Sequence, residues 1–226
     1  MTTAGELDPP HVLVVGAGSG LGAAVARRFA REGCAVTLLA RREETVEAVA
    51  ADLRRDGAAV HTTTADAADP VAFRAALEVL AGRAAYGVVV YNVGLVVADD
   101  VLTSTSDHLR DALAVDVLGA VTTAQVFTPA MRRAGTGTLL VTGGGPGLVP
   151  DPQHASLSLG KAALHAAVSL LHEQLAGDGV HVAAVVVVGV IATGTALDPD
   201  RIAQTYWELH REPAGAWRAQ VVLDGT

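Results

Sequence analysis

Short apolar segments alternate along the chain with longer segments in which apolar and polar residues mix. The apolar segments, several of them rich in valine, predict buried strands of a parallel sheet. These strands are expected at Val12–Val15, Ala35–Ala40, Ala58–Thr64, Val88–Tyr91, Thr138–Val141, Val180–Val188 and Trp217–Leu223. Helices are expected between them, at Ala23–Arg31, Glu43–Asp56, from Asp69-Pro70 onward, Thr103–Thr122, Ala155–Ala176 and Asp200–Arg211. This alternation predicts an α/β fold, a doubly wound parallel sheet of about seven strands with helices on both faces.

Composition narrows the class of protein. The length of 226 residues suits one α/β domain, so we expect a single domain over residues 1–226, with 1–10 as a flexible N-terminal segment. No apolar run reaches the roughly eighteen residues of a membrane span. Met1–Pro10 is polar and acidic, unlike a secretory signal. A cytoplasmic location is therefore the default expectation, without a membrane partner.

Charge and cysteine content exclude further classes. The net charge of −8 argues against general nucleic-acid binding. Cys34 is the only cysteine, so the chain has neither an internal disulfide nor a cysteine metal cluster. No metal site is expected.

Four glycines directly follow the first predicted strand, and a helix follows them. Strand, glycine turn and helix together form the first half of a Rossmann-like dinucleotide-binding unit. Glycine permits the tight turn and the close approach of N–H groups to a pyrophosphate, which the helix N-terminus also attracts. The alternative is a tight turn that holds no ligand. The expected cofactor-binding residues here are Gly16, Gly18, Ser19, Gly20, Leu21 and Gly22.

The spacing Gly16-x-x-x-Gly20-x-Gly22 resembles that of the short-chain dehydrogenase/reductase family, although Val15 stands where the family usually has threonine. The resemblance extends from Val12 to Gly225. It implies a nicotinamide dinucleotide as cofactor and an unknown small molecule as substrate. Two later segments resemble the family's N-N-A-G and P-G-x-x-x-T motifs. The cofactor-binding residues that they imply are Asn92, Val93 and Gly94 in the first and Gly189, Ile191 and Thr193 in the second.

Arg41 and Arg42 follow the second predicted strand, where the ribose 2′ position would lie. Arginine suits a 2′-phosphate, so NADP(H) is expected in preference to NAD(H). The alternative is a solvated charge pair at a helix start. Asp66 and Ala67 end the third strand, where the resemblance implies a contact to adenine; the alternative for Asp66 is a simple turn aspartate.

The catalytic motif departs from the family. The family's Tyr-x-x-x-Lys falls on Leu157 to Lys161, Gly144 takes the place of the catalytic serine, and Asp116 takes that of the asparagine. Lys161, which in the family also holds the ribose, is retained. The chain therefore resembles an atypical subgroup that lacks the tyrosine and serine but keeps the lysine.

Other residues could supply acid–base chemistry. His154 lies seven positions before Lys161, on the same face if the helix begins that early, and histidine titrates near neutrality. The alternative is a surface histidine in a loop. Asp116 could pair with Lys161 or be a plain buried carboxylate. Lys161, Asp116 and His154 are thus tentative catalytic residues. Only Gly194–Pro199 separates Thr193 from the next helix, which leaves little chain to cover a substrate.

Three hypotheses follow. The chain is an NADP(H)-binding oxidoreductase with weak or atypical redox chemistry, a pseudoenzyme that senses the cofactor or binds a partner, or a non-redox enzyme that uses the same cleft. In relatives, the helices that match Thr103–Thr122 and Ala155–Ala176 pack across a two-fold axis, so we expect a homodimer or homotetramer with an isologous contact.

Overall fold

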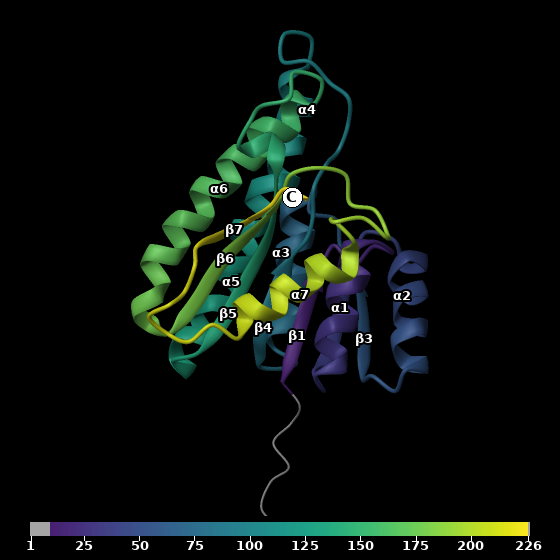
Figure 1. Cartoon of the computed structure of the whole chain (residues 1–226), viewed down its shortest axis with the longest axis vertical. Coiled ribbons are helices and arrows are strands. Elements are labelled where there is room, and N and C mark those ends of the chain that lie inside the picture. Colours follow the sequence, from purple (N-terminus) through teal and green to yellow (C-terminus); the bar gives the residue numbers. More distant parts are fainter. Residues whose placement is uncertain (1–9, 226) are drawn as a thin grey trace, which may run out of the picture.

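A seven-stranded parallel sheet forms the centre of the computed structural model, which describes residues 10–225 (Figure 1). Its strand order is β3-β2-β1-β4-β5-β6-β7. The strands are β1 (His11–Val15), β2 (Ala35–Ala40), β3 (Val60–Thr64), β4 (Tyr86–Tyr91), β5 (Gly137–Gly144), β6 (Val180–Val187) and β7 (Gln220–Leu223). The predicted doubly wound α/β fold is confirmed. The N-terminal segment expected at residues 1–10 lies outside the described residues, apart from Pro10.

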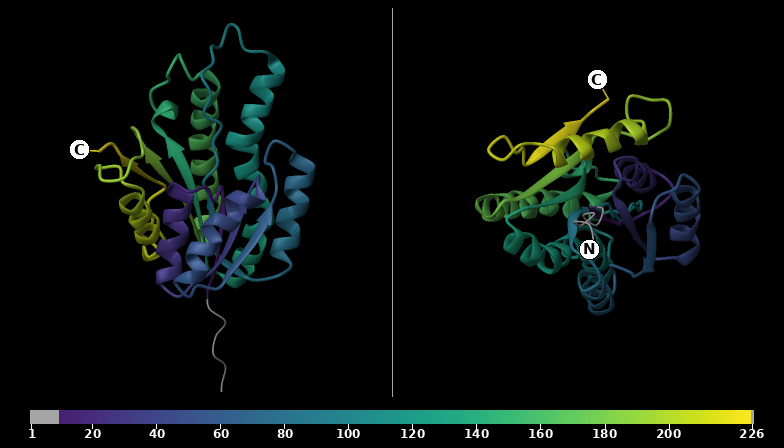
Figure 2. Two further views of the ribbon diagram at one scale, coloured as in Figure 1. Left: turned by 90° about the vertical axis from the view of Figure 1, so that its right-hand side faces the viewer. Right: turned by 90° about the horizontal axis from the view of Figure 1, so that it is seen from below.

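Helices cover both faces of this sheet, as the view from below in Figure 2 shows. One layer consists of α1 (Leu21–Arg31), α2 (Glu43–Arg55) and α7 (Pro199–His210), and the other of α3 (Pro70–Ala81), α5 (Gly119–Ala134) and α6 (Ala155–Leu175). Successive strand residues point to opposite faces. Val12 and Val14 thus join the core under α1, while Leu13 and Val15 join the second core under α3 and α5.

The helix expected at Thr103–Thr122 differs most from its prediction. The structure has α4 (Ser106–Leu113), a π-helical turn at Ala114–Leu118 and then α5, which continues to Ala134. The adjacent Thr122 and Thr123 do not end α5. Thr123 is buried, and its hydroxyl donates to the carbonyl of Gly119 one turn earlier (2.7 Å). By length and composition alone the stretch Ser106–Ala134 could cross a membrane, but 56% of its apolar window is buried inside the protein.

Smaller differences concern element ends. β5 runs three residues beyond its predicted end, to Gly144, and β7 begins at Gln220 rather than Trp217. One short 3-10 turn, Gly145–Gly147, follows β5, and another, Ala176–Asp178, follows α6. The predicted start of α3 is confirmed, since the Asp69 side chain caps the helix by accepting from the N–H groups of Val71 and Ala72.

Candidate functional site

A cavity of about 300 Å³ opens at the carboxyl ends of the strands, beside the boundary of β1 and β4. The strand order reverses at this boundary, where doubly wound sheets bind their ligands. Nine of the predicted cofactor-binding residues line the cavity: Gly16, Gly18, Arg41, Arg42, Asp66, Ala67, Asn92, Val93 and Gly94. The sequence analysis did not predict the other eight lining residues, which are Val15, Leu39, Ala40, Thr45, Ala65, Phe73, Leu95 and Val115.

The four glycines of the turn have two distinct roles. Gly16 has φ +86°, and a Cβ on it would lie 2.2 Å from the carbonyl oxygen of Asn92. A Cβ on Gly22 would lie 2.4 Å from the carbonyl oxygen of Gly16, so this glycine lets α1 pack against the turn. Beside Gly18 and Gly20, in contrast, there is open space. Gly20 also precedes α1 without a side-chain cap, which leaves N–H groups at the helix start for an anion.

A partly buried chain of hydrogen bonds supports this turn. Asn92 donates its Nδ2 proton to the carbonyl of Gly16 (3.0 Å) and accepts from Thr142 Oγ1 (2.7 Å). The Tyr206 hydroxyl on α7 lies 2.6 Å from Thr142 Oγ1. Because the single hydroxyl proton of Thr142 goes to Asn92, Tyr206 is the donor to Thr142. The chain therefore links α7 through β5 and β4 to the glycine turn.

Arg41 and Arg42 lie at the far end of the cavity, between β2 and α2. Both are exposed, and Arg42 forms a solvent-exposed ion pair with Glu44 (3.6 Å). Arg41 makes no hydrogen bond or ion pair among the described residues. Asp66 stabilises its own turn by accepting from the N–H of Ala68 (3.0 Å). The Arg41 guanidinium is thus free to meet an anion at this end.

The π-helical turn places Asp116 in the protein interior. The Tyr91 hydroxyl donates to the carbonyl of Val115 within this turn, and a Cβ on Gly119 would collide with the same hydroxyl. Asp116 is fully buried, and its Oδ1 accepts from the N–H of Leu95 (3.0 Å). Its Oδ2 has no hydrogen-bond partner among the described residues. Burial raises the pKa of the Asp116 carboxyl, against the opposing effect of Lys161.

Lys161 is 5% exposed, and protein atoms surround its ammonium group. Nζ donates to the carbonyls of Val93 (3.0 Å) and Thr142 (3.1 Å) and lies 3.9 Å from Asp116 Oδ1. Burial lowers the pKa of Lys161, and the Asp116 carboxylate opposes this shift. The pairing considered for Asp116 and Lys161 is therefore present as a buried ion pair.

Leu157 and Gly144, which the sequence analysis aligned with the family's tyrosine and serine, lie near this pair and carry no acid–base group. Leu157, one turn before Lys161 on α6, is 8% exposed. Gly144 ends β5, and a Cβ on it would lie 3.7 Å from Lys161 Cγ. Neither residue can donate a proton to a developing alkoxide.

His154 directly precedes α6. Its Nδ1 lies 2.8 Å from Asp151 Oδ2, within the turn that leads to the helix. The first N–H groups of α6 are bound by Asp99, whose Oδ1 accepts from the N–H of Ser156 (3.1 Å). Although burial opposes the shift, hydrogen bonds from Ser156 and His108 lower the pKa of Asp99 to about 2. His154 is not among the residues that line the cavity.

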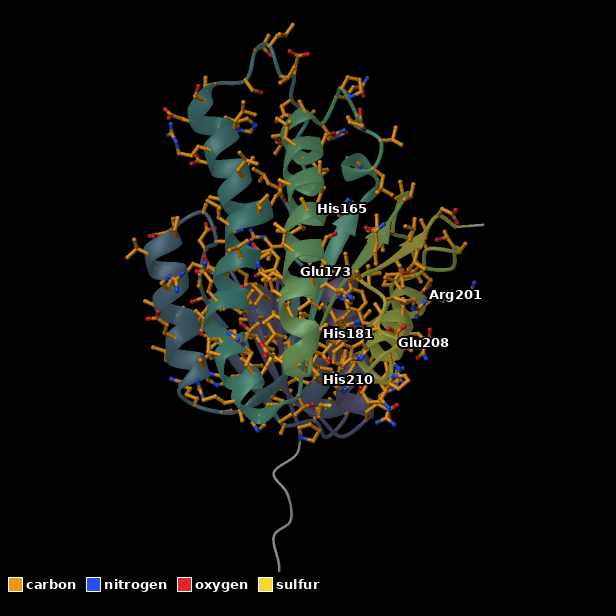
Figure 3. All side chains as sticks on the ribbon, turned by 90° about the vertical axis from the view of Figure 1, so that its left-hand side faces the viewer. His165, Glu173, His181, Arg201, Glu208 and His210 are labelled. Atoms are coloured by element: carbon orange, nitrogen blue, oxygen red, sulfur yellow. The ribbon has the colours of Figure 1, made fainter. Side chains whose placement is uncertain are left out.

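His165, which the sequence analysis did not consider, lies one turn after Lys161 and projects from α6 toward β5 (Figure 3). Its ring occupies the space beside Gly143, where a Cβ would lie 2.8 Å from Nε2. Burial, and then the charge of Lys161, lower its pKa. His181 and His210 lie near the opposite end of the sheet in Figure 3, away from the site.

The segment after β6 carries the remaining predicted residues, Gly189, Ile191 and Thr193. It folds on itself: Gly194 donates its N–H to Asp198 Oδ2 (2.7 Å), and buried Leu197 packs against Gly189. Gly189, Ile191 and Thr193 are exposed and do not line the cavity. The short segment thus adds none of these three residues to the lining of the cavity.

Comparison with known proteins identifies the family. Residues 10–201 match the short chain dehydrogenase family. The chain is 32% identical over 191 residues to galactitol 2-dehydrogenase (L-tagatose-forming) of Cereibacter sphaeroides, a match that covers 83% of this chain and 74% of that enzyme. It is 31% identical over 161 residues to an uncharacterized oxidoreductase of Mycobacterium tuberculosis, covering 70% of this chain. That match spans only 61% of the relative's length.

Among solved structures, a metagenomic short-chain oxidoreductase in complex with NADP is similar to this protein with a TM-score of 0.87 and 26% identity. The superposition covers 96% of this chain and 97% of the other. With the family match over residues 10–201, the glycine turn and the strand order, the chain belongs to the short-chain dehydrogenase family.

Proposed function

We propose that this protein binds NADP(H) and, as a member of an atypical subgroup, performs little or no carbonyl reduction of the family's tyrosine-dependent kind. The observation that carries this proposal is that Arg41, which makes no ion pair among the described residues, lines the cavity, while Leu157 and Gly144 near Lys161 offer neither an acid nor a hydroxyl. The NADP complex of the similar metagenomic oxidoreductase supports the choice of ligand.

The residues at the site fit such a cofactor. Gly18 and Gly20 leave open space where a pyrophosphate would approach the start of α1, and Arg41 offers unpaired donors for a 2′-phosphate. Asp66 and Ala67 line the part of the cavity suited to adenine. When bound, the nicotinamide would donate or accept a hydride.

The residues around Lys161 do little to promote that transfer. Carbonyl reduction needs a proton donor, and general acid catalysis contributes about 10²–10⁴-fold. A lost oxyanion donor costs on the order of 10²–10³-fold. Leu157 and Gly144 supply neither function, and Lys161 donates to two backbone carbonyls instead. Lys161 and Asp116 therefore act mainly as a buried pair that holds α6 to the π-helical turn.

The proposal includes a cytoplasmic homodimer or homotetramer. Leu159 and Leu170 on α6 are 47% and 62% exposed. They lie eleven positions apart and so share one helix face. An isologous contact through α6 of a second copy would bury both side chains.

Calorimetric titration with NADP⁺ and NAD⁺, followed by a turnover screen, tests the proposal. We expect binding of NADP⁺ without reduction of aldehydes or ketones by NADPH. Turnover without any nicotinamide cofactor would favour the third hypothesis, a non-redox enzyme. For that outcome His154 is the acid–base group to test, because Asp151 orients its ring.

A further inference from the structure

We propose that the site recognises the adenosine 2′-phosphate half of the dinucleotide alone and contributes no binding free energy through the nicotinamide half. This inference rests on the proposed NADP(H) binding and specifies which part of the ligand the protein binds. It makes any nucleotide with an adenosine 2′-phosphate group a ligand of comparable affinity.

The cavity is small and does not include Lys161 among its lining residues. Its volume of about 300 Å³ lies at the small end of the range for ligand pockets, about 300–1,000 Å³. Arg41 and Asp66 line one end and Gly94 the other. A Cβ on Gly94 would lie 3.2 Å from Lys161 Nζ, so the backbone of Gly94 separates the cavity from the ammonium group.

Lys161 is already engaged by the protein. The carbonyls of Val93 and Thr142 accept two of its three ammonium protons, and the Asp116 carboxylate lies 3.9 Å away. Its side chain is 7% exposed. A ribose hydroxyl would have to replace bonds that are already made in the interior, so a new bond to Lys161 would add little net free energy.

The segment after β6 offers no second set of contacts. Val190 is 82% exposed and Ile191 37% exposed. The turn is fixed by the Gly194–Asp198 hydrogen bond and by Leu197 against Gly189, rather than by residues of the cleft. A nicotinamide ring at this edge would remain in water, and groups that stay hydrated do not add to affinity.

The test compares two ligands on the full chain by titration calorimetry. Adenosine 2′,5′-bisphosphate carries the adenosine, the 2′-phosphate and one 5′-phosphate of NADP⁺, but no nicotinamide. We expect the two Kd values to agree within about fivefold, which is a difference of about 1 kcal/mol or less. Arg41→Ala should weaken both ligands by the same factor, whereas the control Arg55→Ala, an exposed arginine elsewhere on α2, should weaken neither.

The emission of NADPH gives an independent readout, because it reports the surroundings of the nicotinamide ring. At saturation we expect the emission spectrum of free NADPH. NADP⁺ that binds more than about fivefold tighter than the bisphosphate, or a strongly enhanced and blue-shifted emission, would overturn the inference and leave NADP(H) binding intact. If neither ligand binds, both the inference and the proposed function fail.

Discussion

Asp99 and Ser156 lie 57 residues apart in the sequence, yet the Asp99 carboxylate caps α6 through the N–H of Ser156 (3.1 Å). The other carboxylate oxygen lies 2.7 Å from Nε2 of His108 on α4. A single, nearly buried carboxylate thereby joins the segment before α4, α4 itself and the start of the helix that carries Lys161.

This relationship predicts a specific loss of stability in acid. The folded-state pKa of Asp99 is about 2, below its ordinary 3.8. The ionised carboxylate therefore stabilises the fold above pH 3.8, and this contribution is lost as the pH falls toward 2. Asp99→Asn should cost about 1 kcal/mol at pH 6, because neutral hydrogen bonds are weaker than charge-assisted ones. Urea unfolding should show that the difference in unfolding free energy between Asp99→Asn and the unmodified protein shrinks as the pH falls from 3.8 toward 2. A difference that stays constant with pH would contradict this role of the Asp99 carboxylate.

Arg41→Asp should reverse cofactor preference. The substitution removes a donor for the 2′-phosphate and adds a carboxylate that repels it but can accept from a 2′-hydroxyl. We expect NADP⁺ to bind at least about tenfold more weakly, about 1.4 kcal/mol, and NAD⁺ to bind more tightly. Arg55→Asp makes the same charge change at the other end of α2 and serves as control. Equal affinities for the two cofactors in the unmodified protein would disprove the predicted preference.

Two glycines of the turn should respond differently to alanine. Gly16→Ala places a Cβ at a positive φ and against the carbonyl of Asn92, so we expect a loss of at least about 2 kcal/mol in unfolding free energy. Gly18→Ala meets open space in the protein. Gly18→Ala should leave the midpoint of thermal unfolding nearly unchanged. It should weaken NADP⁺ binding, because the added methyl group takes the space that the pyrophosphate would occupy. Equal destabilisation by both substitutions would refute this division of roles.

Restoring the family's residues should raise carbonyl reduction. Gly144→Ser fits sterically, since the nearest atoms to a Cβ are 3.6 Å and 3.7 Å away. Combined with Leu157→Tyr, it returns a polarising hydroxyl and an acid beside Lys161. Steady-state assays with NADPH over a panel of aldehydes and ketones should show a gain over a near-zero starting rate. The short segment Gly194–Pro199 leaves little chain to hold a substrate in place, which limits this gain, because misplacement of a substrate alone costs about 10²-fold.

The unmodified protein is the critical comparison for that experiment. Turnover on the order of 1–10 s⁻¹, as in typical enzymes, would contradict the proposal. His154→Ala would then identify whether the Asp151–His154 pair supplies the proton.

The exposed face of α6 predicts self-association. Light scattering at micromolar concentration should give a dimer or a larger assembly for the unmodified protein. Leu170→Lys should shift it toward the monomer, because a charge on the α6 face would be buried in an isologous contact. Leu102→Lys, at a side chain that is 90% exposed and outside α6, is the matched control. A monomer in the unmodified protein would rule out this interface.

The sequence by itself was sufficient for the order and type of nearly all strands and helices, and for the identity of the residues aligned with the family's catalytic motif. Those features are local: β-branched apolar runs predict buried strands, and glycines between a strand and a helix predict the turn. The absence of an acid at Leu157 and of a hydroxyl at Gly144 follows from residue identity alone.

Only the tertiary structure decided how the site is held together. Helical periodicity cannot reveal the one-residue insertion of a π-helical turn. In the structure the hydroxyl of Tyr91 bonds to the carbonyl of Val115 in this turn, and the adjacent Asp116 lies beside Lys161. The engagement of Lys161 by two carbonyls likewise joins three elements distant in the chain. A hydrogen bond between distant residues leaves no periodic trace in the sequence, because it depends on where packing brings the two backbones.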